Sequence, residues 1–115
     1  MKKILVTGIF NVLHPGHIRL LKFAKSLGDT LIVGIQSDRI AAEGAHVKDT
    51  HRLEMVVNNI SVNKAFIFDS NVKEIIEKIK PDIIVKGNEH KNYFNEEKKH
   101  IEKIGGELIF HSSQN

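Results

Sequence analysis

The sequence predicts an α/β fold in which a five-stranded parallel sheet lies between two layers of helices. Short apolar runs alternate along the 115 residues with segments whose apolar side chains recur every three or four positions. These are the patterns of buried strands and of amphipathic helices. Residues 31–35 are all Leu, Ile, Val or Gly, as expected of a strand covered on both faces. No repeat or Gly/Ser/Pro-rich linker divides the chain, so we expect a single domain over residues 1–115 with a Rossmann-like, three-layer arrangement.

The first half of the chain is predicted to form two strands, each followed by a helix. The first strand covers residues 2–6, and an amphipathic helix follows over 17–27, where Gly28 ends it. The second strand covers 31–35. The next helix begins near Thr50, and its apolar residues lie on one side: Leu53, Val56, Val57 and Ile60.

The second half continues the alternation. Ser70 or Asn71 is the expected N-cap of the next helix, and Pro81 ends that helical segment. The elements expected here are a strand at 65–68, a helix at 72–79, a strand at 83–85, a charged helix at 95–104 and a strand at 108–110.

The composition excludes several classes of function. The chain has no Cys, which rules out a disulfide framework, a thiolate zinc site and a catalytic thiol. No apolar run approaches the roughly 18 residues of a membrane span, and the apolar run after Lys3 is interrupted too early for a secretory signal. The net charge is +3, but the basic residues are scattered and only 6% of residues are aromatic. We therefore expect a cytoplasmic domain with no nucleic-acid partner and no membrane partner.

The loop over residues 8–17 is the most informative part of the chain, because parallel sheets bind ligands beyond the carboxyl ends of their strands. Pro15 suits the first turn of a helix, and Gly16 removes a side chain where that helix begins. The free amides at a helix N-terminus favour phosphate. His14 and His17 lie three residues apart, so both can project to one side and donate hydrogen bonds to phosphate oxygens.

Other kinds of ligand site fit residues 8–17 less well. A dinucleotide-binding fingerprint needs three glycines in the pattern G-x-G-x-x-G, and only Gly8 and Gly16 are present. The Gly-Lys-Ser/Thr of a phosphate-binding P-loop is absent. A metal site at His14 and His17 is kept as an alternative, although no third ligand lies nearby in the sequence.

The string His14-Pro15-Gly16-His17 resembles the H-x-G-H signature of the cytidylyltransferase-like nucleotidyltransferases. The resemblance covers nearly the whole chain. Residues 32–38 resemble the family's second strand, Arg52 its helix arginine, and residues 81–87 its fourth strand and following loop. Within the family, the pattern is similar to ADP-heptose synthase and glycerol-3-phosphate cytidylyltransferase.

This resemblance implies an enzyme that joins a nucleoside triphosphate, CTP or ATP, to a phosphorylated sugar or polyol and releases pyrophosphate. A phosphate monoester has a second pKa of about 6, so no strong general base is needed. Catalysis then consists of positioning and charge stabilisation. The resemblance also implies a homodimer and a Mg²⁺ cofactor held mainly by nucleotide phosphates, with no metal ligand from the protein.

The resemblance assigns roles to individual residues. His14, His17 and Arg52 would be catalytic, and Asn11 and Lys48 would contact the phosphorylated substrate. The nucleotide would be bound by Gly8, Ile9, Phe10, Gly16, Lys86, Gly87, Glu89 and His90. The alternative for Arg52 is a surface salt bridge, and the alternative for Lys86 is a solvated strand end. The charged run at residues 96–99 is interpreted as a solvated helix face.

The chain departs from the family pattern at several positions. Asn11 stands where the family usually has Asp, and Glu43 stands where relatives tend to carry Lys, so we expect Lys48 to substitute. The sequence stops at residue 115, where relatives continue through a Ser/Thr-rich phosphate-binding turn into a final helix, and we expect the domain to lack that segment. An alternative function is therefore a nucleotide-binding module of the same fold without catalysis.

Overall fold

A computed structural model describes residues 1–88 and 95–112 of the chain. Its centre is a five-stranded sheet with the strand order β3-β2-β1-β4-β5, and all neighbouring strands run parallel. The strands are β1 (Lys3–Gly8), β2 (Thr30–Gln36), β3 (Lys64–Phe68), β4 (Ile83–Gly87) and β5 (Glu107–His111). The predicted α/β fold with a five-stranded parallel sheet is confirmed.

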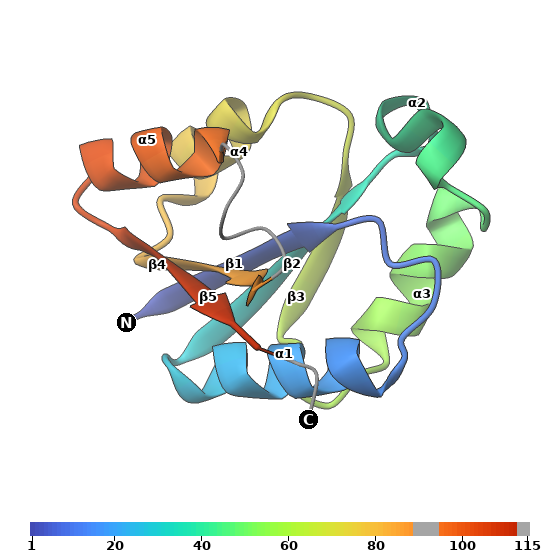
Figure 1. The fold of residues 1–115 in the computed structure, drawn as a ribbon, viewed down its shortest axis with the longest axis horizontal. Helices are drawn as coiled ribbons and strands as arrows, with labels where there is room; N and C mark the ends of the chain where they lie inside the picture. Colours follow the sequence, from blue (N-terminus) through green and yellow to red (C-terminus); the bar gives the residue numbers. More distant parts are fainter. Residues whose placement is uncertain (89–94, 113–115) are drawn as a thin grey trace.

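Helices cover both faces of this sheet (Figure 1). They are α1 (Pro15–Ser26), α2 (Asp38–Ala41), the 3-10 turn η1 (Ala42–Gly44), α3 (Asp49–Val57), α4 (Val72–Ile79) and α5 (Glu96–Lys103). Helices α1 and α3 lie on one side of the sheet, and α4 and α5 lie on the other. Among the described residues, no helix has the length and apolarity that crossing a membrane would require.

Successive side chains along each strand point to opposite faces of the sheet, and this divides the core into two layers. Ile4 and Val6 of β1 pack with Leu21 of α1 and with Val56 of α3. The residue between them, Leu5, belongs to the opposite layer, which also holds Ile75 and Ile76 of α4 and Ile101 of α5. Each strand therefore buries both of its faces, which is why strands such as β2 are apolar without interruption.

Local sequence explains where several helices begin and end. Helix α4 has the predicted bounds, and Asn71 is its N-cap, with Oδ1 accepting a hydrogen bond from the Glu74 amide at 2.9 Å. Lys80 ends this helix in the left-handed conformation, with φ of 53°. Helix α1 begins at Pro15, two residues before its predicted start, because His14 caps it.

Two expectations about the region between β2 and β3 are wrong. Helix α2 and the turn η1 were not predicted; α2 begins where Ser37 Oγ accepts a hydrogen bond from the Ile40 amide at 3.2 Å. Helix α3 ends at Val57, so Ile60 lies beyond it and is fully exposed. Asn58 and Asn59 follow Val57, and Asn side chains favour turns over helix interiors because they compete for backbone hydrogen bonds.

The strand order creates a place for a ligand. The chain moves outward from β1 to β2 and β3, and then returns to β4 on the other side of β1. The β1–β4 ladder ends at Leu5 and Ile84, whereas β1 stays paired with β2 as far as Gly8 and Ile35. A crevice outside the carboxyl ends of β1 and β4 is where open sheets of this kind bind ligands.

Candidate active site

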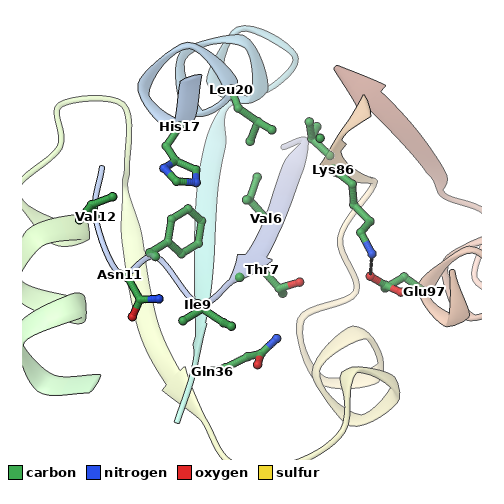
Figure 2. Close-up of a pocket in the computed structure, with 14 residues that line it drawn as sticks. Val6, Thr7, Ile9, Asn11, Val12, His17, Leu20, Gln36, Lys86 and Glu97 are labelled. Atoms are coloured by element: carbon green, nitrogen blue, oxygen red, sulfur yellow. Dashed lines mark hydrogen bonds and ion pairs between the residues drawn. The ribbon is translucent and has the colours of Figure 1, made fainter. Parts of the chain in front are cut away.

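A cleft of about 510 Å³ lies at the carboxyl ends of β1 and β4 (Figure 2). The end of β1, the loop after it, α1, the ends of β2 and β4, and α5 all contribute to its lining. The lining residues are Val6, Thr7, Gly8, Ile9, Phe10, Asn11, Val12, His17, Leu20, Gln36, Val85, Lys86, Gly87 and Glu97.

Phe10 fixes the shape of the loop after β1. Its φ is 57°, a left-handed conformation that costs a non-glycine residue roughly 1–2 kcal/mol. Phe10 is only 7% exposed, and the burial of its side chain offsets that cost. A Cβ on Gly8 would lie 3.0 Å from this ring, so the missing side chain of Gly8 makes room for Phe10.

His14 and His17 form a stacked pair at the start of α1. Their ring centroids are 3.8 Å apart with an interplanar angle of 29°. His14 is the N-cap, and its Nδ1 accepts a hydrogen bond from the Gly16 amide at 3.0 Å. In the neutral ring the proton is then on Nε2, which can donate to a ligand. Phe10 meets His17 edge-on at 5.6 Å, so the second imidazole is supported by the loop and projects into the cleft.

Arg52 is fully buried under the cleft and has a different environment from the one predicted. Nη1 donates to the carbonyls of Ile9 at 2.8 Å and Gln36 at 2.7 Å. Nε donates to the Val47 carbonyl at 2.7 Å, and Nη2 pairs with Asp38 Oδ1 at 2.8 Å. A surface salt bridge is therefore the wrong description, and a contact with a nucleotide phosphate would require these bonds to break. In this structure Arg52 positions the loop after β1.

Asn11 ties the same loop to the segment after η1. Its Nδ2 donates to the Gly44 carbonyl at 2.8 Å, and its Oδ1 accepts from the His46 amide at 2.8 Å. An aspartate could make only the second of these bonds when ionised. The Asn in place of the family's usual Asp therefore fits the backbone that it meets, while its side chain still lines the cleft.

Lys86 and Glu97 face each other on the other wall of the cleft (Figure 2). Lys86 Nζ lies 2.6 Å from Glu97 Oε2 and donates to Asn95 Oδ1 at 2.7 Å. The side chains of Lys86 and Glu97 are only 17% and 12% exposed. The interpretation of residues 96–99 as a solvated face is therefore wrong for Glu97, and Lys86 is not a solvated strand end.

The remaining predicted residues differ in their relation to the cleft. Gly87 lines it, whereas Gly16 is buried in α1 and directs its amide to His14. Lys48 is exposed and does not line the cleft; its carbonyl accepts the Arg52 amide at 3.0 Å at the start of α3. The predicted nucleotide-binding residues at positions 89 and 90 lie outside the described residues.

The described residues do not fit a metal ion held by protein ligands alone. In residues 1–88 and 95–112, no group of three or more His, Cys, Asp or Glu side chains is placed to hold one. The carboxylate that lines the cleft, Glu97, already bonds to Lys86. Magnesium bound through nucleotide phosphates would require few protein ligands.

One carboxyl group near the end of β2 has a shifted pKa. Ser37 Oγ donates to Asp69 Oδ1 at 2.6 Å, and Arg39 Nε donates to the same atom at 2.9 Å. The hydrogen bonds from Ser37 and Arg39 lower the pKa of Asp69 below its ordinary value. Ser37 is also the N-cap of α2, so this contact fixes where α2 begins relative to β3.

Solved structures share this arrangement of strands and helices. The lipopolysaccharide core biosynthesis protein from Thermoplasma volcanium GSS1 superposes with a TM-score of 0.86 and 28% identity, and the match covers 100% of this chain and 99% of that one. A pantoate-beta-alanine ligase from Francisella tularensis, 16% identical with a TM-score of 0.73, shares the fold over 99% of this chain and 60% of its own.

Curated relatives match in sequence. The Bifunctional protein HldE of Marinomonas sp. (strain MWYL1) is 38% identical over 95 residues, which cover 77% of this chain and 20% of that protein. The FAD synthase of Ferroglobus placidus is 36% identical over 100 residues, covering 84% of this chain and 64% of that protein. The chain thus spans about a fifth of the first relative and somewhat under two thirds of the second. The cytidylyltransferase-like family model matches residues 5–111, and the chain belongs to the cytidylyltransferase-like family.

Proposed function

We propose that the protein is a nucleotidyltransferase that joins a nucleoside triphosphate, CTP or ATP, to a phosphorylated sugar or polyol and releases pyrophosphate. The stacked pair of His14 and His17 at the N-terminus of α1, beside the cleft at the ends of β1 and β4, is the observation that carries this proposal. The name of the Thermoplasma volcanium protein refers to lipopolysaccharide core, which contains sugars, and favours a sugar phosphate as acceptor.

The proposed reaction is a substitution at the α-phosphorus of the nucleotide. An ionised phosphate oxygen of the acceptor forms the new bond to phosphorus. The bond from that phosphorus to the oxygen bridging to the β-phosphate breaks, and pyrophosphate leaves with the electron pair. The acceptor is already largely ionised because its second pKa is about 6. No proton has to be removed by a strong base, and the nucleotide enters as its magnesium complex.

The chain's own residues would stabilise the charge that this reaction moves onto phosphate oxygens. The His14 Nε2–H and the imidazole of His17 provide donors beside the positive end of a 12-residue helix. Rings held in place before the reaction need little reorganisation when the charge develops, which is the source of this kind of catalysis. Phe10 supports His17, and Arg52 holds the Ile9 carbonyl, so the donors are fixed in advance.

The test combines nucleotide binding with turnover. Melting temperature is recorded with ATP, CTP, GTP and UTP, each with magnesium. A ligand at about 100 times its Kd stabilises by roughly 2.7 kcal/mol, or about 11 °C at the roughly 4 °C per kcal/mol expected near this size. Pyrophosphate release is then measured with the stabilising nucleotide and a panel of sugar and polyol phosphates.

His17→Ala should abolish both the stabilisation and pyrophosphate release. His51→Ala is the matched control, because this exposed imidazole of α3 does not line the cleft. No stabilisation by any nucleotide would contradict the proposal. Nucleotide binding that depends on His17, without turnover on any acceptor, would instead support the non-catalytic nucleotide-binding module.

A further inference from the structure

The Lys86–Glu97 pair is an ion pair within the wall of the cleft that lies opposite His17. Lys86 comes from β4 and Glu97 from α5, and both side chains are largely buried. Oε2 of Glu97 bonds to Lys86 Nζ at 2.6 Å. Within residues 1–88 and 95–112, no hydrogen bond involves Oε1 of this carboxylate, and this second oxygen is the one considered as an acceptor for a ligand.

The charge balance of this pair is unsuited to binding phosphate. A lysine alone would attract the anionic nucleotide, but Glu97 neutralises it at 2.6 Å. Moving Lys86 towards a phosphate would leave an unpaired carboxylate facing an anion in a partly buried cleft, which is costly. A neutral group with hydroxyls suits the pair better, because the carboxylate accepts hydrogen bonds and the ammonium keeps a third donor.

The position of the proposed phosphate site determines which hydroxyls of a bound nucleotide would reach the Lys86–Glu97 pair. The proposed phosphate site is at His17 and the start of α1, on the wall opposite Lys86 and Glu97 (Figure 2). The group joined directly to the α-phosphate of a nucleotide is its ribose. A ribose presents two adjacent hydroxyls, at the 2′ and 3′ positions, and a single carboxylate can accept hydrogen bonds from both.

We propose that Glu97, held in place by Lys86, accepts hydrogen bonds from the ribose 2′- and 3′-hydroxyls and selects ribonucleotides over deoxyribonucleotides. This inference rests on the proposed function, because it requires a nucleotide in the cleft. The quantity that tests this inference is the ratio of the affinity for a ribonucleotide to the affinity for its deoxy form. General damage to the cleft weakens both nucleotides alike and leaves that ratio unchanged.

The test measures Kd by calorimetry for ATP, CTP and their 2′-deoxy and 3′-deoxy forms, with magnesium. A hydrogen bond to a charged group corresponds to roughly tenfold or more in affinity. The wild type should therefore prefer the ribonucleotide over each deoxy form by about tenfold or more. In Glu97→Ala both ratios should fall to within about twofold of one, and Glu97→Gln should give intermediate ratios because one acceptor oxygen remains.

Glu96→Ala is the matched control. Glu96 is the neighbouring carboxylate of α5, but it is 58% exposed and contacts His100 instead of the cleft. This variant should keep the wild-type ratios. If Glu97→Ala does not melt cooperatively, Glu97→Gln carries the comparison, since it keeps the size of the side chain.

The outcomes separate this inference from the function on which it rests. A wild-type ratio near one, or a wild-type ratio retained in Glu97→Ala and Glu97→Gln, overturns the role of Glu97 and leaves nucleotide binding established. Failure of the wild type to bind either ATP or CTP overturns the proposed function itself.

Discussion

Replacing Arg52 with alanine should destabilise the protein by about 3–5 kcal/mol. The side chain is fully buried, and its four hydrogen bonds are 2.7–2.8 Å long, to the carbonyls of Val47, Ile9 and Gln36 and to Asp38. Each carbonyl left without a donor costs roughly 1–3 kcal/mol, and water entering the cavity recovers part of that cost. Asp38 is 47% exposed and is resolvated. The three carbonyls together account for roughly 3–9 kcal/mol, and solvation by entering water brings the expected loss to about 3–5 kcal/mol.

This loss should appear as a fall in melting temperature of about 12–20 °C, at roughly 4 °C per kcal/mol for a chain of this length. Thermal and urea unfolding followed by circular dichroism measure it. Arg52→Lys should be nearly as damaging, because a single ammonium does not reproduce the fork of a guanidinium. Asp38→Asn should cost no more than about 1 kcal/mol, since the three carbonyl bonds remain.

Arg52→Ala also distinguishes support of the loop after β1 from a direct contact between Arg52 and a phosphate. If Arg52→Ala melts within about 2 °C of the wild type, the hydrogen bonds do not hold the loop and the reasoning is refuted. If it keeps its stability but loses pyrophosphate release, the predicted direct contact with a phosphate is correct. A loss of stability with release retained at low temperature places the residue in the support of the site alone.

Two further predictions concern polar contacts around the end of β2. Asn11→Asp removes the donor to the Gly44 carbonyl and places a carboxylate beside it, so urea unfolding should show a loss of about 1–3 kcal/mol at pH 7. That loss should shrink near pH 3, where the acid is protonated and can donate; equal stability to the wild type at pH 7 would contradict the assigned bond. The lowered pKa of Asp69, caused by hydrogen bonds from Ser37 and Arg39, adds stability above its ordinary value of 3.8, and this stability is lost as the pH falls through the folded-state pKa. Asp69→Asn should therefore flatten the decline of the urea midpoint below pH 4, and an unchanged decline would refute this contribution.

The positions of the strands along the chain and most helix bounds could be predicted from local sequence, because burial on two faces leaves a continuous apolar signal. Helix α4 follows its caps and apolar spacing over Val72–Ile79 without deviation. Helix α2 has no such signal, because none of its four residues is buried and its N-cap, Ser37, is buried beside β3. Periodicity reports burial, so short exposed helices escape it.

The roles of Arg52 and Glu97 depend on contacts between segments that are distant in the sequence. Arg52 bonds to a carbonyl 43 residues away, and Lys86 reaches Glu97 only because α5 packs beside β4. One local sign was present: Arg52 lies four residues before the buried Val56, on the same side of α3, which predicts a buried guanidinium. Glu97 carries the same sign, since it lies four residues before the buried Ile101 of α5.

The loop after β1 is held from three directions before any ligand arrives. Arg52 binds the Ile9 carbonyl from below, Asn11 reaches the Gly44 carbonyl on one side, and the ring of Phe10 packs over Gly8 on the other. A left-handed Phe10 persists only when its surroundings determine it in this way. The wall that supports His17 is therefore built by folding, and a nucleotide bound there, as proposed, would not have to order it. On the opposite wall, Lys86 of β4 pairs with Glu97 of α5 apart from these contacts. Under the proposed role of Glu97, nucleotide selection would therefore change there without altering the proposed phosphate site.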